Sequence, residues 1–368
     1  MDFGILNAMQ QRHRSKPATQ ILNEAVEQTK VAEDLGFGRV WYVEHHFSNY
    51  SICPSPLLMA AHLAGQTKKI RLGTGVVVAP LYQPPRLLAE IAMVDTLSNG
   101  RLDVGVGTGY QEYEFARFGL TLDNRSEKTV EVLELIHKGL TQPSFTYDGK
   151  FFKQPNTAIN VRPVQSPYPP VWLAGTDPML HRAAARYGFN ILLSGQAGST
   201  RRLGRFLDTV RDSYRAEGAD PNGFNFGLLR AAFVTESKKE AEHYADCLRY
   251  QQRLAVSLKR RTEVVVDDYM VAEVPYEDEL PLDKIASNLM VGDPHRCAEI
   301  VTQEIQALGV NHLVIQPQIG DIEIKAALRS MERWMTEVVP LVEKVLGKPI
   351  AEVNPMKPCK PLATLAAE

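Results

Sequence analysis

A carboxylate and two imidazoles stand side by side in the sequence, as Glu44, His45 and His46. They follow directly on an apolar, β-branched and aromatic run at 40–43, which predicts a buried parallel strand. Proteins with parallel sheets place reactive groups at the carboxyl ends of such strands. Because imidazole titrates near neutral pH, this triplet could hold and pass a proton. The alternative is a pair of surface histidines in a strand-to-helix loop.

The spacing of these residues argues against two other kinds of site. The triplet does not match the HExxH pattern of zinc enzymes, and no third ligand stands at a telling distance in the chain. The cysteines lack CxxC spacing, which argues against a disulfide framework and a cysteine zinc site. No GxSxG or Cys/His elbow supports nucleophilic hydrolysis. We therefore expect no metal site. The cysteines are Cys53, Cys247, Cys297 and Cys359.

Small residues gather at three other predicted strand ends, at 73–75, 105–109 and 174–176. They would let a flat or phosphorylated ligand approach the backbone closely. The run at 105–109 does not match a dinucleotide fingerprint, because no GxGxxG followed by a helix is present.

A possible phosphate site follows the fifth predicted strand, at Gly175-Thr176-Asp177. Pro178 opens a helix there, and the amide groups of its first turn could hold a phosphate. A simple Thr or Asp helix cap is the alternative. Arg125, just before an earlier helix, could neutralise the phosphate or be a solvated arginine.

Strand and helix patterns alternate along the chain. Eight strands, each followed by a helix, would form a (β/α)₈ TIM-type barrel within residues 1–346, with a doubly wound open sheet as the alternative. We expect strands at 3–7, 39–44, 70–79, 101–107, 171–174, 191–193, 224–234 and 311–316. We expect helices at 17–35, 56–65, 85–94, 126–140, 178–187, 201–217, 238–250, 294–308 and 322–345.

Two stretches interrupt this alternation. Prolines and a turn signal at 147–150 predict an insertion with a hairpin at 141–170. The stretch 251–290 is either a solvated loop with a helix or two or a cap over a site. The tail at 347–368, rich in Pro and Ala, is expected to be poorly ordered.

The composition is that of an ordinary soluble protein, with 44% hydrophobic and 23% charged residues. A formal net charge of −2 provides no electrostatic footprint for nucleic acid or an anionic membrane. The start lacks a basic segment and a long apolar core, and no apolar run approaches the ~18 residues of a membrane span. We expect a cytosolic protein.

An ordered set of short motifs across residues 1–345 resembles the bacterial luciferase-like family of flavin-dependent monooxygenases, in particular the luciferase catalytic-subunit branch. Each motif is weak alone, but their order and spacing agree with the family. The motifs lie at 44–47, 56–64, 71–76, 84–85, 89–90, 97–102, 105–109, 118–125, 184–188 and 291–294.

The resemblance implies a TIM-type barrel that binds reduced FMN as a cosubstrate and activates O₂. A separate flavin reductase would supply the reduced FMN, and a homodimer is expected. His45 takes the role of the catalytic imidazole beside the flavin, with His46 as its neighbour. Glu44 would orient the imidazoles or cap nearby amides.

The resemblance also implies where the flavin lies. A strand bulge, often with a cis peptide behind the flavin ring, maps to Gly75-Val76. The phosphate loop maps to the segment from Gly175 to Met179, together with Arg125. An arginine that binds phosphate in luciferase is Thr108 here, so we predict weakly held FMN; tight stoichiometric flavin in the purified protein would contradict this. The flavin-binding residues implied are Gly75, Val76, Gly107, Thr108, Arg125, Ala174, Gly175, Thr176, Asp177 and Met179.

The organic substrate does not follow from the resemblance, since relatives oxidise aldehydes, alkanes, ketones, sulfonates or aromatics. Light emission is not implied. Four aromatic residues could wall a pocket or belong to the core: Phe3, Trp41, Tyr110 and Phe115. Two other functions remain as alternatives: a deazaflavin-dependent oxidoreductase of the same superfamily, and a non-catalytic flavin-binding subunit.

Overall fold

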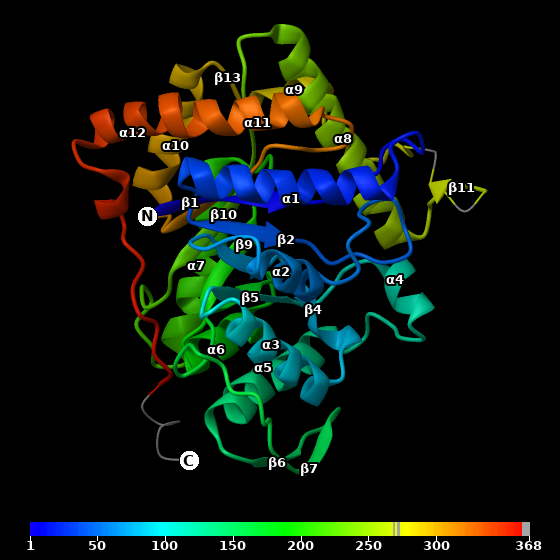
Figure 1. The fold of residues 1–368 in the computed structure, drawn as a ribbon, viewed down its shortest axis with the longest axis vertical. Helices are drawn as coiled ribbons and strands as arrows, with labels where there is room; N and C mark the ends of the chain where they lie inside the picture. Colours follow the sequence, from blue (N-terminus) through cyan, green and yellow to red (C-terminus); the bar gives the residue numbers. More distant parts are fainter. Residues whose placement is uncertain (268, 271–272, 363–368) are drawn as a thin grey trace.

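A closed barrel of parallel strands forms the centre of the protein (Figure 1). This computed structural model describes residues 1–267, 269–270 and 273–362. The sheet closes because β14 pairs with β1 and β9 pairs with β10. The predicted (β/α)₈ barrel is thus confirmed, and the open-sheet alternative is wrong. The barrel strands are β1 (Asp2–Asn7), β2 (Arg39–Tyr42), β3 (Arg71–Thr74), β4 (Val77–Val78), β5 (Leu102–Gly107), β8 (Val171–Ala174), β9 (Asn190–Ser194), β10 (Phe226–Val234) and β14 (His312–Gln316).

Most helices surround the barrel where the 3.6-residue pattern predicted them, with small shifts at their ends. The helix predicted at 238–250 continues to residue 260, and the helix at 112–117 was not predicted. The predicted helix over 322–345 is interrupted by a π-helical turn, because Pro340 has no amide hydrogen to donate to the preceding turn. The surrounding helices are α1 (Ala18–Leu35), α2 (Pro56–Ala64), α3 (Pro84–Leu97), α4 (Glu112–Arg117), α5 (Arg125–Thr141), α6 (Pro178–Tyr187), α7 (Thr200–Ala216), α8 (Lys238–Arg260), α10 (Pro294–Leu308), α11 (Ile324–Arg333), the π-helical η2 (Trp334–Val338) and α12 (Val339–Leu346).

The third strand of the barrel is divided into two short strands. The single strand predicted at 70–79 is instead β3, a cis peptide between Gly75 and Val76, β4 and the short helix η1 (Ala79–Leu81). The cis bond implied by the family resemblance is therefore present. Glycine is required opposite this break, because a Cβ on Gly105 would lie 1.9 Å from the carbonyl oxygen of Thr74.

The two insertions lie apart. The first contains the predicted hairpin, formed by β6 (Phe145–Asp148) and β7 (Lys153–Thr157), at the bottom of Figure 1. The second begins later than predicted, because Leu254 and Leu258 continue the buried face of α8 to Arg260. It then contains the hairpin of β11 (Val265–Val266) and β12 (Tyr269–Met270), the helix α9 (Leu282–Ser287) and β13 (Met290–Gly292), which pairs with β10.

The tail packs along the barrel instead of being poorly ordered. After η3 (Ile350–Glu352), the carbonyl oxygens of Asn354 and Lys357 accept hydrogen bonds from Asn311 and Asn225 at 3.0 and 2.8 Å. The prediction of poor order is wrong for 347–362, and residues 363–368 lie outside the described part. None of the described helices is both long and apolar enough to cross a bilayer.

Buried charges fill the barrel at the amino ends of its strands. Asp103 accepts from Arg39 Nε at 3.2 Å and from Arg71 Nε at 2.6 Å, and all three charges are thereby paired. Asp2 joins the network, since its Oδ1 lies 2.5 Å from His312 Nδ1 and its Oδ2 pairs with Arg39. Although burial acts to raise it, the two guanidinium groups hold the pKa of Asp103 below its ordinary value.

Candidate active site

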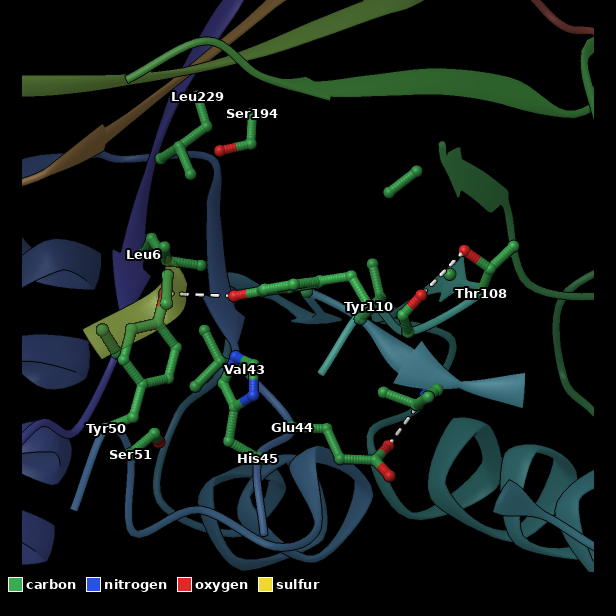
Figure 2. A pocket seen from close by; sticks show the side chains of 18 of the residues that line it. Leu6, Val43, Glu44, His45, Tyr50, Ser51, Thr108, Tyr110, Ser194 and Leu229 are labelled. Atoms are coloured by element: carbon green, nitrogen blue, oxygen red, sulfur yellow. Dashed lines mark hydrogen bonds between the residues drawn. The ribbon is translucent and has the colours of Figure 1, made fainter. Parts of the chain in front are cut away.

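A cavity of about 560 Å³ opens at the carboxyl ends of the barrel strands (Figure 2). Most of the predicted site residues line it, although they come from five separate segments of the chain. His46, Asp177 and Met179 do not line it. The predicted residues that do are Glu44, His45, Gly75, Val76, Gly107, Thr108, Arg125, Ala174, Gly175 and Thr176.

His45 is held by a carboxylate that the sequence analysis missed. Its Nδ1 lies 3.0 Å from Oε1 of Glu114, and the same oxygen accepts from the backbone amide of His46 at 2.7 Å. Glu114 is 1% exposed and comes from α4. A carboxylate only accepts, so Nδ1 carries the hydrogen and Nε2 of His45 is left as the free proton site. Helix α4 is a six-residue element, too short to produce a periodic pattern that would predict it.

Glu44 orients His46 and not His45. Its Oε1 lies 2.9 Å from Nε2 of His46, while its Oε2 accepts from the amide of Val78 at 3.0 Å and the hydroxyl of Tyr82 at 2.9 Å. Glu44 therefore contacts one of the two imidazoles that it was predicted to orient, and it also caps a backbone amide. The ring of His46 packs against Phe118 and lines a separate hollow of about 520 Å³ between α2 and α3.

Tyrosines flank His45 inside the cavity. The ring of Tyr50 meets that of His45 edge to face at 4.6 Å, and its hydroxyl lies 3.3 Å from that of Tyr110 (Figure 2). Burial raises the pKa of Tyr50, so both tyrosines remain protonated donors at neutral pH. Of the four aromatic residues considered as pocket walls, only Tyr110 lines the cavity. The other three are core residues at most 2% exposed: Phe3, Trp41 and Phe115.

The opposite side of the cavity offers groups without protein partners. Arg125 begins α5, and its buried Nε has no hydrogen-bond partner among the described residues. The backbone is bare at Gly107, where a Cβ would lie 2.6 Å from Val76, and at Gly175, where it would lie 2.8 Å from Leu180. A partly buried guanidinium beside bare backbone fits a phosphorylated, planar ligand such as FMN.

Asp177 and Met179 act at the helix start and do not face the cavity. The carboxylate of Asp177 accepts from the amide of Met179 at 2.9 Å, which is the helix cap considered as the alternative. Thr108 lines the cavity, and its hydroxyl donates to the carbonyl of Gly109 at 3.2 Å (Figure 2). It supplies no charge, so Arg125 is left as the predicted phosphate-binding cation.

Helix α8 contributes residues that the sequence analysis placed in an irregular stretch. Gln251, Gln252, Ala255 and Lys259 line the cavity. Since α8 contacts α4, its second half covers the side of the cavity that holds His45. The signal was present in the sequence as a continued apolar face, which the prediction ended ten residues early.

The protein family, a curated relative and a solved structure that match this chain are all described as monooxygenases. Residues 1–312 match the family described as luciferase-like monooxygenase. The oxygenase component of a flavin-dependent trigonelline monooxygenase from Acinetobacter baylyi is 29% identical over 357 residues, covering 92% of this chain and 95% of that protein.

Two solved structures share the fold. The oxygenating constituent of 3,6-diketocamphane monooxygenase from Pseudomonas putida, a type II Baeyer-Villiger monooxygenase in complex with FMN, has a TM-score of 0.74 at 19% identity, covering 92% of this chain and 98% of that one. An F420-dependent secondary alcohol dehydrogenase, in complex with an F420-acetone adduct, has a TM-score of 0.71 at 19% identity. The match covers 93% of this chain and 98% of the dehydrogenase chain.

Proposed function

Because the chain belongs to the luciferase-like monooxygenase family, we propose that it uses reduced FMN and O₂ to oxygenate a small organic substrate. The family and the trigonelline relative make it an oxidoreductase of the flavin monooxygenase kind. The observation that carries the finer proposal is the cavity itself. It has an oriented imidazole on one side and, on the other, bare backbone and a guanidinium whose Nε has no partner among the described residues. When bound, reduced FMN supplies the electrons that activate O₂.

The residues of the chain would divide the work. Arg125 and the loop at Gly175 and Thr176 would bind the phosphate, and Gly107 and the Gly75-Val76 bond would face the ring system. Their backbone allows a planar ring to approach without clashing with a side chain.

His45 would hold and deliver the proton that oxygen transfer requires. Glu114 fixes the hydrogen on Nδ1, so that Nε2 of His45 can accept and return a proton at the cavity side. Tyr50 and Tyr110, both donors, would keep the substrate and water oriented beside it. The second half of α8 would limit the entry of water.

Two partners belong to this proposal. A separate flavin reductase would supply reduced FMN, which is supported by the relative being named as an oxygenase component. A second copy of the chain would cover the outer face of α2 and α3, where Leu58, Met93 and Leu97 are each more than half exposed. Light scattering of the purified protein tests this second partner.

The test of the function mixes the protein and reduced FMN with O₂ and follows oxidised flavin by absorbance. We expect oxidised FMN to appear much more slowly than from free reduced FMN, and to appear faster when a substrate is added, with less H₂O₂ released. Candidate aldehydes, ketones and aromatic compounds can be screened by that acceleration. Reoxidation at the rate of free flavin would contradict the proposal, and the same titration with the deazaflavin would then test the alternative supported by the F420-dependent neighbour.

A further inference from the structure

Three metal-binding side chains meet outside the active-site cavity. His243 and Cys247 stand four residues apart on α8, which places them on one face of the helix, and Asp321 approaches them from the loop between β14 and α11. The Sγ of Cys247 lies 3.8 Å from Nε2 of His243 and 3.1 Å from Oδ1 of Asp321, and His243 Nε2 lies 3.6 Å from the same oxygen. We propose that this cluster is a binding site for a divalent metal ion of the zinc class.

The distances between the ligand atoms support a tetrahedral site. With zinc bonds of about 2.0–2.3 Å to nitrogen, oxygen and sulfur, two ligands at the tetrahedral angle lie about 3.3–3.6 Å apart. The three observed separations of 3.1, 3.6 and 3.8 Å bracket that range. An ion therefore fits between these atoms after movements of a few tenths of an ångström.

A fourth ligand stands beside the cluster. Nε2 of His13, in the loop between β1 and α1, lies 3.3 Å from Oδ2 of Asp321. The side chain of His13 is 59% exposed, so it can turn toward an ion or leave that position to water. A soft thiolate together with one or two imidazoles and a carboxylate is a donor set that suits zinc and Co²⁺ better than Mg²⁺ or Ca²⁺.

A guanidinium beside the cluster does not make the region positive. Arg12 Nη1 lies 3.1 Å from Asp321 Oδ1 and 3.5 Å from Cys247 Sγ. Its Nη2 is already bonded to Asp246 at 2.8 Å and to Glu273 at 3.0 Å.

Arg249 also bonds to Asp246, at 2.5 Å. Arg253 lies 3.9 Å from Glu273 and bonds to Glu279 at 2.5 Å. Four carboxylates thus face three guanidinium groups before the thiol of Cys247 ionises. A divalent cation would enter a region of net negative charge.

The position of the cluster gives the ion a structural role. His243 and Cys247 precede the part of α8 that lines the cavity by one to four helical turns. An ion would connect this helix to the loops after β1 and β14, which belong to neighbouring barrel strands. The cysteine spacing in the sequence gave no sign of this site, because its ligands come from segments far apart in the chain.

The test uses Co²⁺ as a probe on the whole protein after removal of metals by a chelator. We expect one Co²⁺ per chain, with thiolate charge-transfer absorbance in the near ultraviolet and intense visible bands typical of tetrahedral Co²⁺, both abolished by added Zn²⁺. Cys247→Ser removes the charge-transfer absorbance, and His243→Gln weakens Co²⁺ binding about tenfold or more. Cys359→Ser is the matched control, since that partly buried cysteine lies elsewhere, bonded to Asn190.

Absence of the charge-transfer absorbance, its persistence in Cys247→Ser or its loss in Cys359→Ser would each overturn the proposal. His243 is exposed, so His243→Gln is expected to fold even if Cys247→Ser does not. Unchanged Co²⁺ affinity in a folded His243→Gln protein would also overturn it. Circular dichroism without metal establishes that each variant is folded.

Discussion

The two ends of the barrel contain the same kinds of side chain in opposite states. At the amino ends of the strands, Asp103 and Arg39 are buried and paired with each other and with their neighbours. At the carboxyl ends, two buried atoms have no hydrogen-bond partner in the described part of the chain: Nε of Arg125 and the side-chain amide oxygen of Gln111. Burying a charge costs free energy unless it is paired, so each end must find partners differently.

The difference indicates what each end is for. At the amino end the chain itself supplies partners for Asp103 and Arg39, so these charges fix the strands relative to one another. At the carboxyl end the chain pairs His45 with Glu114 and leaves other polar groups to a ligand. This agrees with the general division of TIM barrels into a stabilising and a catalytic face. Mutations at the two ends should therefore affect different measurements.

Replacement of His45 by alanine should have the largest effect, and mainly on activity. Loss of a positioned acid–base group lowers turnover by about 10²–10⁴-fold. The loss of stability should be smaller, because Glu114 lines the cavity and still accepts from the amide of His46. Product formation, with a substrate found by the reoxidation screen, and urea denaturation measure the two quantities. His46→Ala is the control, because that ring lies outside the cavity. Equal losses in both variants would contradict the assigned role.

Replacement of Asp103 by alanine should lower the stability of the protein and leave its turnover unchanged. It leaves the buried Arg39 and the partly buried Arg71 without their shared partner, which costs about 3–5 kcal/mol of unfolding free energy. Turnover per folded molecule should not change, since Asp103 lies at the far end of the barrel. Asp212→Ala, which breaks an exposed pair with Arg215, should change stability by less than about 1 kcal/mol. A similar small effect for Asp103→Ala would remove the contrast between the two ends.

Another buried ion pair, between Glu304 and Arg230, tests whether a carboxylate with only one bonded oxygen stabilises the fold. Glu304 of α10 lies 3.1 Å from Arg230 of β10, but Oε2 of the glutamate has no partner among the described residues. Burial raises the pKa of Glu304 to about 7, the reverse of the direction for Asp103. The folded protein therefore binds a proton that the unfolded chain releases above about pH 4.5, and stability falls as pH rises from there to about 7.

One pKa unit corresponds to about 1.4 kcal/mol, so this fall is at most about 3.5 kcal/mol. The unfolding free energies of the parent and of Glu304→Gln should be measured in urea at pH 5 and pH 7.5. Other titrating groups are shared by the two proteins, so the parent should lose more stability over this interval than the variant. An equal change in both would show that Glu304 is ionised and well paired in the folded state.

The sequence predicted the barrel well, because most of its strands and long helices have a recognisable local pattern of apolar residues. The triplet at Glu44 was also recognisable, since its residues are adjacent. The cis bond at Gly75-Val76 came from the family resemblance, as no local pattern specifies it.

Features that depend on tertiary contact were not predictable in the same way. Glu114 lies 69 residues from His45, and nothing in its own segment marks it as the partner of an imidazole. The tail at 347–362 looked disordered by composition, yet the amide of Leu362 donates to the carbonyl of Arg186 across the barrel surface. The prediction of an irregular stretch beyond residue 250 was wrong for its first ten residues, because α8 continues to Arg260 where a loop was expected.

Removal of the charge of Arg125 should have the smallest of these effects. It should weaken the binding of FMN and leave the binding of riboflavin unchanged. A hydrogen bond between charged groups contributes about 1.5–3 kcal/mol, so Arg125→Gln should weaken FMN binding about 10–100-fold. Riboflavin has no phosphate, so its affinity should not change, and titration of flavin fluorescence measures both. Lys259→Gln removes the same charge from another part of the cavity wall and should affect FMN less. If Arg125→Gln weakened riboflavin and FMN equally, the guanidinium would be shaping the cavity and not binding phosphate. The unpaired group at the carboxyl end would then serve the fold, as its paired counterparts do at the amino end.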